Sequence, residues 1–320
     1  MSNLNSARVL LDPASEELQF LPEGPYAIDN NRFSWVAIQH GANANFGSLN
    51  IFDLSNNTNQ SFPLPGRPGF AFPTSLPNVF VVGCERSLAF YDANTGDWQV
   101  FEDQVDHDVA NTIINDGLVH RSNLIFGTKD LEFKTQKAGL YLWRKKDRKL
   151  IRLRNDQICS NGKAVIEQVD GTVLLYDIDT PTKQVACYII DIDEGTIGPR
   201  QVALDLSDLP FFPDGMTMTA DQLSVIISFY NPSAAEYGET RQYRLSDGEL
   251  EMTWTTPGSP QATCPRLISH DGKVRLVITT AVEHMPAEDR AAAPNAGSIF
   301  IADTQFTQPS DAPKFRHFDI

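Results

Sequence analysis

The sequence has 320 residues, of which 41% are apolar and 21% are charged, a composition typical of a soluble globular protein. The formal net charge of −15 argues against nucleic acid or an anionic membrane as the main partner, because both require a basic protein surface. The four cysteines show no paired spacing, so we expect reduced thiols. The first residues have no basic and no apolar segment, so we expect a cytoplasmic protein without a membrane span.

Short runs of β-branched and aromatic residues recur along the whole chain, and turn sequences with glycine or asparagine separate them. This rhythm predicts an antiparallel all-β protein. Only residues 285–293 suggest a helical turn or two, inside a loop. The predicted strands are 33–38, 79–83, 124–128, 173–178, 223–229 and 274–280.

Six turn-like segments precede strand runs at a nearly constant interval. Their anchor positions lie near residues 23, 69, 115, 161, 214 and 264, at steps of 46, 46, 46, 53 and 50. Periods of this length are typical of propellers, in which four strands form one blade. The sequence therefore predicts one six-bladed β-propeller domain over residues 1–320. We expect the apolar segment 297–302 to complete a blade begun elsewhere and to close the ring.

Four of the anchors carry oxygen ligands. In a propeller the innermost strands surround a central channel, so we expect Glu23, Asn115, Asn161 and Asp214 to converge there. Two carboxylates and two amides suit calcium, magnesium or manganese better than zinc. Taken one at a time, these residues are also ordinary turn residues, and it is their shared spacing that favours a metal site in the channel.

Motifs around these anchors resemble the senescence marker protein/gluconolactonase/luciferin-regenerating enzyme-like family (SMP-30/gluconolactonase/LRE-like). The resemblance implies a divalent metal, calcium first and magnesium, manganese or zinc as alternatives, held by Glu23, Asn161 and Asp214, with Asn115 nearby as a further ligand or a substrate contact. The matching segments, in the family's order, are 21–26 (LPEGPY), 115–117 (NDG), 126–128 (FGT), 138–141 (AGLY), 160–162 (SNG), 179–183 (DTPTK), 212–216 (FPDGM) and 279–281 (TTA).

The resemblance also implies a small-molecule lactone substrate, a hydrolase that acts as a monomer or homodimer, and Asp214 as the catalytic residue that activates or orients water. Ile113 stands where sugar lactonases of this family often carry a substrate-binding arginine. An apolar residue there puts sugar-acid substrates in doubt, and it keeps a non-catalytic metal-binding or ligand-binding propeller open as the alternative. The motif Gly-x-Ser-x-Gly is absent, which argues against an α/β-hydrolase.

Two charged or polar segments offer further substrate contacts. The segment from Lys129 to Lys137 is interpreted either as a substrate-reading lid, with Glu132 or Lys129 in contact, or as a solvated charged loop. Residues 231–240 are interpreted either as shaping the pocket or as a plain insertion.

Overall fold

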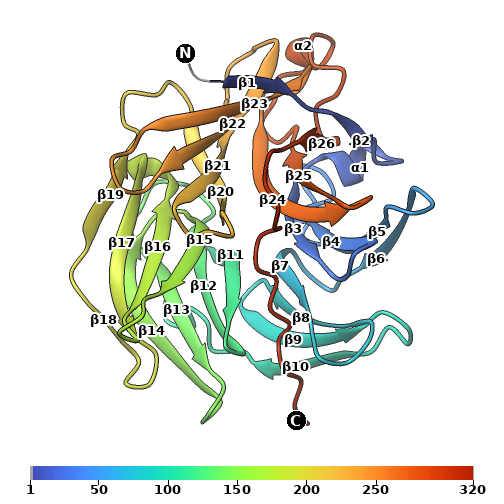
Figure 1. Ribbon diagram of the computed structural model, residues 1–320. Coiled ribbons are helices and arrows are strands. Elements are labelled where there is room, and N and C mark those ends of the chain that lie inside the picture. The colour runs from blue at the N-terminus through green and yellow to red at the C-terminus, as the bar shows by residue number, and fades with distance from the viewer. Residues whose placement is uncertain (1–2, 320) are drawn as a thin grey trace. The chain divides into compact units, whose positions relative to one another are not determined.

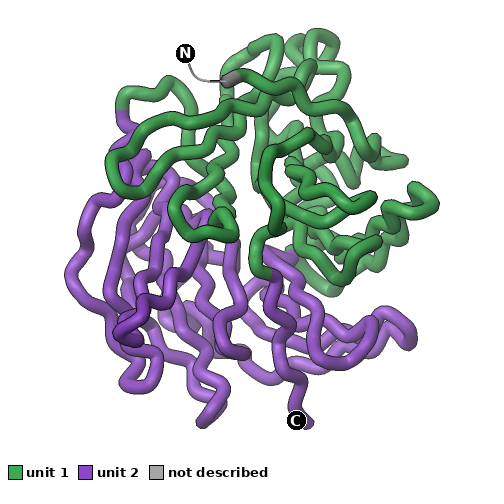
Figure 2. Tube along the Cα trace, in the orientation of Figure 1, with its two compact units in different colours: residues 1–67, 208–311 green, residues 68–207, 312–320 purple. Residues whose placement is uncertain are grey.

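The structure is a computed structural model that describes residues 3–319. The chain divides into two compact units, which Figure 2 draws in different colours: unit 1 comprises residues 1–67 and 208–311, and unit 2 comprises residues 68–207 and 312–320. Each unit contains three sheets of its own. No helix among residues 3–319 is long and apolar enough to cross a membrane.

Unit 1 holds the first, fifth and sixth sheets in chain order, and two helices of one turn each, α1 (Glu16–Gln19) and α2 (Ala287–Arg290) (Figure 1). Its strands are β3 (Pro22–Ala27), β4 (Arg32–Ala37), β5 (Ser48–Asp53) and β6 (Thr58–Pro63) in the first sheet; β20 (Phe212–Met218), β21 (Ser224–Tyr230), β22 (Tyr237–Arg244), β23 (Leu250–Pro257) and β1 (Asn3–Ser6) in the fifth; and β24 (Ala262–His270), β25 (Lys273–Thr280), β26 (Ile299–Asp303) and β2 (Arg8–Leu11) in the sixth.

Unit 2 holds the second, third and fourth sheets and a short 3-10 turn at Thr180–Thr182. Its strands are β7 (Pro68–Pro73), β8 (Val79–Cys84), β9 (Ser87–Asp92) and β10 (Trp98–Glu102) in the second sheet; β11 (Thr112–His120), β12 (Asn123–Asp130), β13 (Ala138–Arg144) and β14 (Lys149–Gln157) in the third; and β15 (Ser160–Glu167), β16 (Val173–Asp179), β17 (Gln184–Asp191), β18 (Thr196–Ile197) and β19 (Gln201–Asp205) in the fourth.

Six successive sheets, antiparallel except where β1 pairs parallel with β23, have the topology of a six-bladed β-propeller. The predicted fold class is therefore confirmed. All six predicted strand runs are also confirmed, and each of them is the second strand of its sheet: β4, β8, β12, β16, β21 and β25. Every residue of β8 and β12 is buried, whereas the outermost strand β6 is largely exposed. Strands covered on both faces read as continuous apolar runs, and for this reason the sequence marked the second strands most clearly.

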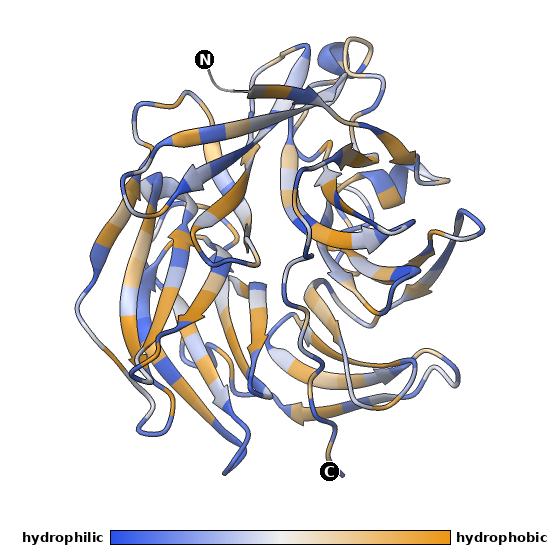
Figure 3. Cartoon of the chain, viewed as in Figure 1, coloured by the Kyte–Doolittle hydropathy of each residue, from blue (hydrophilic) through white to orange (hydrophobic). Residues whose placement is uncertain are grey.

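The core of each unit lies between neighbouring sheets. In unit 1, Phe33 and Trp35 of β4 pack with Ile268 and Val277 of the sixth sheet. In unit 2, residues of β12 and β13 pack with Leu175 and Ile190 of the fourth sheet in the same way. The hydropathy colouring in Figure 3 follows this packing, since apolar bands recur along the strands and polar colours gather at the turns.

The sixth sheet is completed by β2, the second strand of the chain. Strand β2 pairs antiparallel with β26, so that Arg8 lies opposite Ile301 and Val9 opposite Phe300. The segment 297–302 thus forms the third strand of the sheet that β24 and β25 begin. We had expected this segment to complete a blade begun elsewhere. The structure corrects that expectation, because it is β2, from the other end of the chain, that completes the sheet.

The C-terminal residues pack on the second and third sheets within unit 2. Phe315 is fully buried and forms a parallel bridge with Thr74. The Phe318 ring is stacked on Trp143, with centroids 5.4 Å apart and planes inclined by 8°, and the Lys145 ammonium lies 4.6 Å from its centroid. These contacts give unit 2 an aromatic cluster that the strand and turn pattern did not predict.

Deleting residues 3–11 should lower the melting temperature by about 5 °C or more, because it uncovers the edge of β26, where Ile299 and Phe300 are buried. Thermal melts followed by circular dichroism measure the effect. The control is Val9→Thr, which changes an exposed side chain of the same strand and should alter stability by less than about 0.5 kcal/mol. A truncated protein that melts with the full-length chain would contradict the role assigned to β2.

Candidate functional site

A β-bulge of one extra residue interrupts the first strand of every sheet at the predicted anchor position. A bulge redirects the side chains next to it and is common near functional sites. The five later anchor residues lie inside their bulges, and Glu23 is the last paired residue before its own. The register shifts fall between Glu23 and Tyr26, Pro68 and Phe70, Ile114 and Gly117, Ser160 and Lys163, Pro213 and Met216, and Ala262 and Pro265.

In unit 1, the bulge of β24 lies in contact with both neighbouring bulges. A Cβ atom on Gly215 would approach Cys264 Sγ to 2.6 Å, so β20 comes against β24 at a distance that only glycine permits. On the other side, the Thr263 hydroxyl donates to the Pro22 carbonyl at 2.7 Å, next to Glu23. Glu23 and Asp214 are 8% and 7% exposed, so unit 1 holds two nearly buried carboxylates on the two strands that flank β24.

In unit 2, three bulges meet in the same manner. A Cβ atom on Gly69 would lie 2.1 Å from the Asn115 carbonyl oxygen, so β7 and β11 are in direct backbone contact there. The Asn115 Nδ2 group donates to the Ser160 carbonyl at 2.8 Å and to Asn161 Oδ1 at 3.0 Å. The structure thus brings Asn115 and Asn161, 46 residues apart in the sequence, into direct contact.

These hydrogen bonds fix which way both amides point. Asn161 Nδ2 donates to Thr180 Oγ1 at 2.8 Å, and the two donors of Asn115 are engaged as described above. The amide nitrogens are therefore committed to the protein. Asn161 Oδ1 already accepts the hydrogen bond from Asn115, but an amide oxygen has two lone pairs, so both Oδ1 atoms can still contact a ligand. Amide oxygens are ligands that a hard divalent cation accepts, so the chemistry of this pair fits the implied metal.

A buried ion pair lies next to Asn161 and holds its backbone in place. The Lys163 ammonium lies 3.1 Å from Asp177 Oδ1, and both side chains are at most 1% exposed. The same ammonium donates to the Asn161 carbonyl at 2.6 Å and to Ser160 Oγ at 2.8 Å. Burial raises the pKa of Asp177, while the charge of Lys163 opposes that shift. Lys163 therefore fixes the backbone of the bulge that presents Asn161, a role that sequence reasoning missed although a lysine inside an apolar strand was a visible signal.

Tyr230, at the end of β21, lies in the electrostatic environment of Asp214. Burial raises its pKa, and the charges of Glu283 and Asp214 raise it further. Its hydroxyl donates to the Glu283 carbonyl at 2.5 Å. Tyr230 is therefore a protonated hydrogen-bond donor at neutral pH.

The four predicted ligands are divided equally between the units: Glu23 and Asp214 belong to unit 1, Asn115 and Asn161 to unit 2. Within residues 3–319 no group of three or more His, Cys, Asp or Glu side chains is arranged to hold a metal. A metal site built from all four residues, and a channel that all six anchors face, stay predictions.

The segment from Lys129 to Lys137 is not a loop throughout. Lys129 and Asp130 belong to β12 and are buried, which corrects the prediction for these two residues. Ile113 lies directly opposite Lys129 in the sheet and is 2% exposed. Glu132 lies in the turn that follows and is exposed.

Asp130 organises the turn that contains Glu132. Its carboxylate accepts backbone N–H groups from Glu132, Lys134 and Thr135 at 2.9 to 3.1 Å, and Lys137 Nζ lies 2.9 Å away. Burial alone would raise the pKa of Asp130, but the Lys137 ammonium and these N–H groups lower it to about 2. The turn is therefore held by a charged carboxylate rather than left free in solvent.

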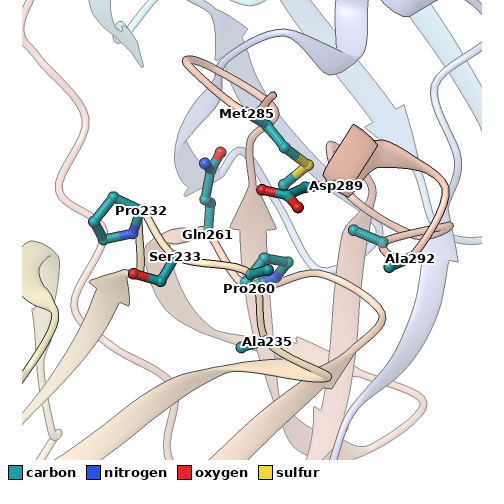
Figure 4. Close-up of a pocket in the computed structure, with 10 residues that line it drawn as sticks. Pro232, Ser233, Ala235, Pro260, Gln261, Met285, Asp289 and Ala292 are labelled. Carbon is teal, nitrogen blue, oxygen red and sulfur yellow. The ribbon is translucent and has the colours of Figure 1, made fainter. Parts of the chain in front are cut away.

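Residues 231–240 line two cavities within unit 1. The smaller, about 10 Å³, holds no more than a water molecule. In Figure 4, Pro232, Ser233 and Ala235 surround it together with Gln261 and Met285. The larger, about 260 Å³, is lined by Phe211, Phe229 and Tyr237 among others. Residues 231–240 thus line cavities inside unit 1, and their part in a substrate pocket stays a prediction.

A third cavity of about 240 Å³ lies within unit 2. Its walls are polar and include Gln136, Gln157, Asp177, Tyr188 and Arg200. The Gln157 Oε1 atom is buried without a hydrogen-bond partner among the described residues. This cavity lies beside the Lys163–Asp177 ion pair, because Asp177 lines it and accepts a hydrogen bond from Gln157 Nε2.

Replacing Gly69 by alanine should lower the free energy of unfolding by about 2 kcal/mol or more, because the new methyl group meets the Asn115 carbonyl oxygen. Gly198→Ala is the matched control in unit 2, since its nearest atom would lie at an ordinary 3.4 Å, and it should change stability by less than about 1 kcal/mol. Urea unfolding measures both. Equal stabilities for the two variants would show that the bulges are not in close contact.

Asp130→Asn should destabilise the protein by about 1–3 kcal/mol at neutral pH, because it removes the charge of a buried acceptor that holds the following turn. The folded pKa is about 2, below the ordinary value of 3.8, so the stabilisation is present above pH 4 and is lost as the pH falls towards 2. Urea unfolding of both proteins at several values between pH 6 and pH 3 should show the difference narrowing. A difference that stays constant over this range would refute the charged turn.

Comparison with known proteins assigns the sequence to a family. The profile of the SMP-30/Gluconolactonase/LRE-like region matches residues 21–282. YvrE of Bacillus subtilis (strain 168), named as a sugar lactone lactonase, is 27% identical over 180 residues, which are 56% of this chain and 57% of YvrE; the chain thus spans only about half the length of this curated relative. The L-arabinolactonase of Azospirillum brasilense is 26% identical over 252 residues, which are 76% of this chain and 77% of that protein.

Solved structures agree on the fold. Regucalcin from Agrobacterium tumefaciens, described as a calcium-binding protein, superposes with a TM-score of 0.80 at 21% identity, and 100% of each chain is covered. A gluconolactonase from Xanthomonas campestris gives a TM-score of 0.64 at 16% identity, with coverage of 93% of this chain and 89% of the other. Since the family profile covers most of the sequence in one continuous match, the chain belongs to the SMP-30/gluconolactonase/LRE-like family.

Proposed function

We propose that this protein is a divalent-metal-dependent hydrolase that opens a lactone ring, as a gluconolactonase does. Family membership supports this proposal, as do relatives that are named lactonases. The observation that carries it is the orientation of the two amides in unit 2. Asn115 and Asn161 direct their N–H groups to protein acceptors. Their two side-chain oxygens, of which Asn161 Oδ1 accepts one hydrogen bond from Asn115, retain lone pairs that suit a hard cation.

In this proposal Glu23, Asn161 and Asp214 hold the cation, and Asn115 contacts the substrate or the cation. Two carboxylates balance the charge of a divalent ion, and all-oxygen ligands favour calcium, with magnesium, manganese or zinc as alternatives. When bound, such a cation would polarise the lactone carbonyl and lower the pKa of a bound water. The proposal joins residues of both units, and it therefore includes the prediction that residues 1–320 act as one domain.

In this proposal the protein's own side chains activate water and position the ligands. Asp214 orients the attacking water and accepts its proton on a carboxylate oxygen. Tyr230 does not act as the base, because burial and the charges of Glu283 and Asp214 keep its hydroxyl protonated. Lys163 holds the Asn161 backbone through its bond to the carbonyl, so that the amide oxygen is presented in one position.

A non-catalytic propeller that binds a metal or ligand is the second candidate. The observation that favours it is Ile113, a buried apolar residue on β11, two positions before Asn115. Both candidates predict metal binding, and only the first predicts turnover.

Asp214→Asn should reduce kcat for lactone hydrolysis about 100-fold or more, since the amide cannot accept the proton from water. The measurement is proton release from a panel of aldonolactones and aliphatic lactones with calcium present, with bound metal determined in parallel. Asp208→Asn removes the same charge from an exposed position of unit 1 and should leave the rate unchanged. Full metal content with a near-normal rate in Asp214→Asn would refute the catalytic role.

The metal itself has an independent readout. Because a ligand that binds only the folded state stabilises it, calcium should raise the melting temperature of the wild-type protein, and a chelator should reverse the increase. Calcium-dependent stabilisation without hydrolysis of any lactone in the panel would instead support the non-catalytic alternative.

A further inference from the structure

Lys129 is a buried lysine at the end of β12, beside the predicted ligands of unit 2. Its backbone pairs with Ile113 on one side and with Cys159 on the other. Ile113 precedes Asn115 by two residues, and Cys159 precedes Asn161 by two residues. Lys129 therefore lies between the two strand starts that lead into the paired amides.

The ammonium of Lys129 has no anionic partner within residues 3–319. The side chain is 7% exposed, and the contact found for its Nζ is the Phe133 ring, 5.8 Å from the centroid. The carboxylate of the adjacent residue Asp130 is engaged elsewhere, because it pairs with Lys137. Burying a cation without an anion is unfavourable, and a cation–π contact offsets only part of that cost.

Lys163 provides the internal comparison. It lies in the same unit and is equally buried, but its ammonium has an ion pair and two hydrogen bonds. The lysine that supports the fold is thus fully satisfied, whereas the ammonium of Lys129 has no such ion pair among residues 3–319.

We propose that Lys129 is the specificity-determining residue of the substrate site and binds a carboxylate carried by the lactone. A charged hydrogen bond to a carboxylate is stronger than one to a hydroxyl, so the preferred substrate class is the lactone of a diacid rather than a neutral aldonolactone. Lys129, which lies opposite Ile113 in the sheet, would then supply the positive charge that an arginine at position 113 would have provided. This inference rests on the proposed lactonase function.

D-Glucaro-1,4-lactone and D-glucono-1,4-lactone test the proposal, because they differ at C6 by a carboxylate against a hydroxymethyl group. The wild type should hydrolyse the glucarolactone with a kcat/KM about 10-fold higher or more. Lys129→Met should lose about 10-fold or more on the glucarolactone and less than 3-fold on the gluconolactone. Lys129→Arg should keep the preference, and Lys134→Met, which removes a charge from the exposed turn nearby, should behave as the wild type.

Two further measurements separate this inference from a structural role and from the proposed function. Lys129→Met should melt at the same temperature as the wild type or higher, because an apolar side chain of similar length replaces an unpaired cation; a structural lysine would lower it. Calorimetric titration of the calcium-loaded protein with D-glucarate, the diacid product, should show at least 10-fold weaker binding to Lys129→Met, whether or not any lactone is turned over. An unchanged ratio between the two lactones, or unchanged glucarate binding, would overturn the assignment of Lys129 while leaving lactone hydrolysis itself intact.

Discussion

Close approach of neighbouring backbones at the six bulges is the constraint on which the rest of this structure depends. Each first strand carries one extra residue at the same place, and the extra residue turns a short segment out of the sheet. Gly69 and Gly215 admit the adjacent strand where any side chain would collide. The polar side chains of the bulges are nearly buried as a result, and a buried polar group must be satisfied by a partner or by a ligand.

Unit 2 meets that requirement by pairing several of its buried charges inside the protein. Asp130 holds a turn, Lys163 and Asp177 hold the bulge of β15, and Tyr141 donates to Asp106 at 2.5 Å beside Arg152. Such satisfied networks fix a unique geometry at modest net stability. Against this background Lys129, which has no ion pair among residues 3–319, is unusual, and the remaining lone pairs of the Asn115 and Asn161 oxygens suit a cation.

The sequence predicted the parts of the fold that repeat. Strands covered on both faces read as unbroken apolar runs, so β8, β12 and β21 were found almost to the residue. The constant step between anchors placed Asn115 and Asn161 at equivalent strand starts, and their contact follows from that equivalence. Interactions that do not repeat left no periodic signal.

The features that the sequence did not predict are interactions that occur only once in the chain. The pairing of β2 with β26 joins the two ends of the chain, and no local pattern encodes a partner about 290 residues away. Lys129 was assigned to a loop because charged residues are rarely buried in strands. The packing of Phe315 and Phe318 on Trp143 depends on a terminal segment that forms no regular strand.

The pairing of the first strands with the last ones also sets the order in which the protein can be completed during its synthesis. Strand β2 is translated early, at residues 8–11, yet its partner β26 is translated only near residue 300. At about 5–20 residues per second, β2 must wait on the order of 15–60 seconds with an unpaired edge. During that interval the sixth sheet is unfinished, and its open strand edge is a place where another chain could pair until β26 has been made.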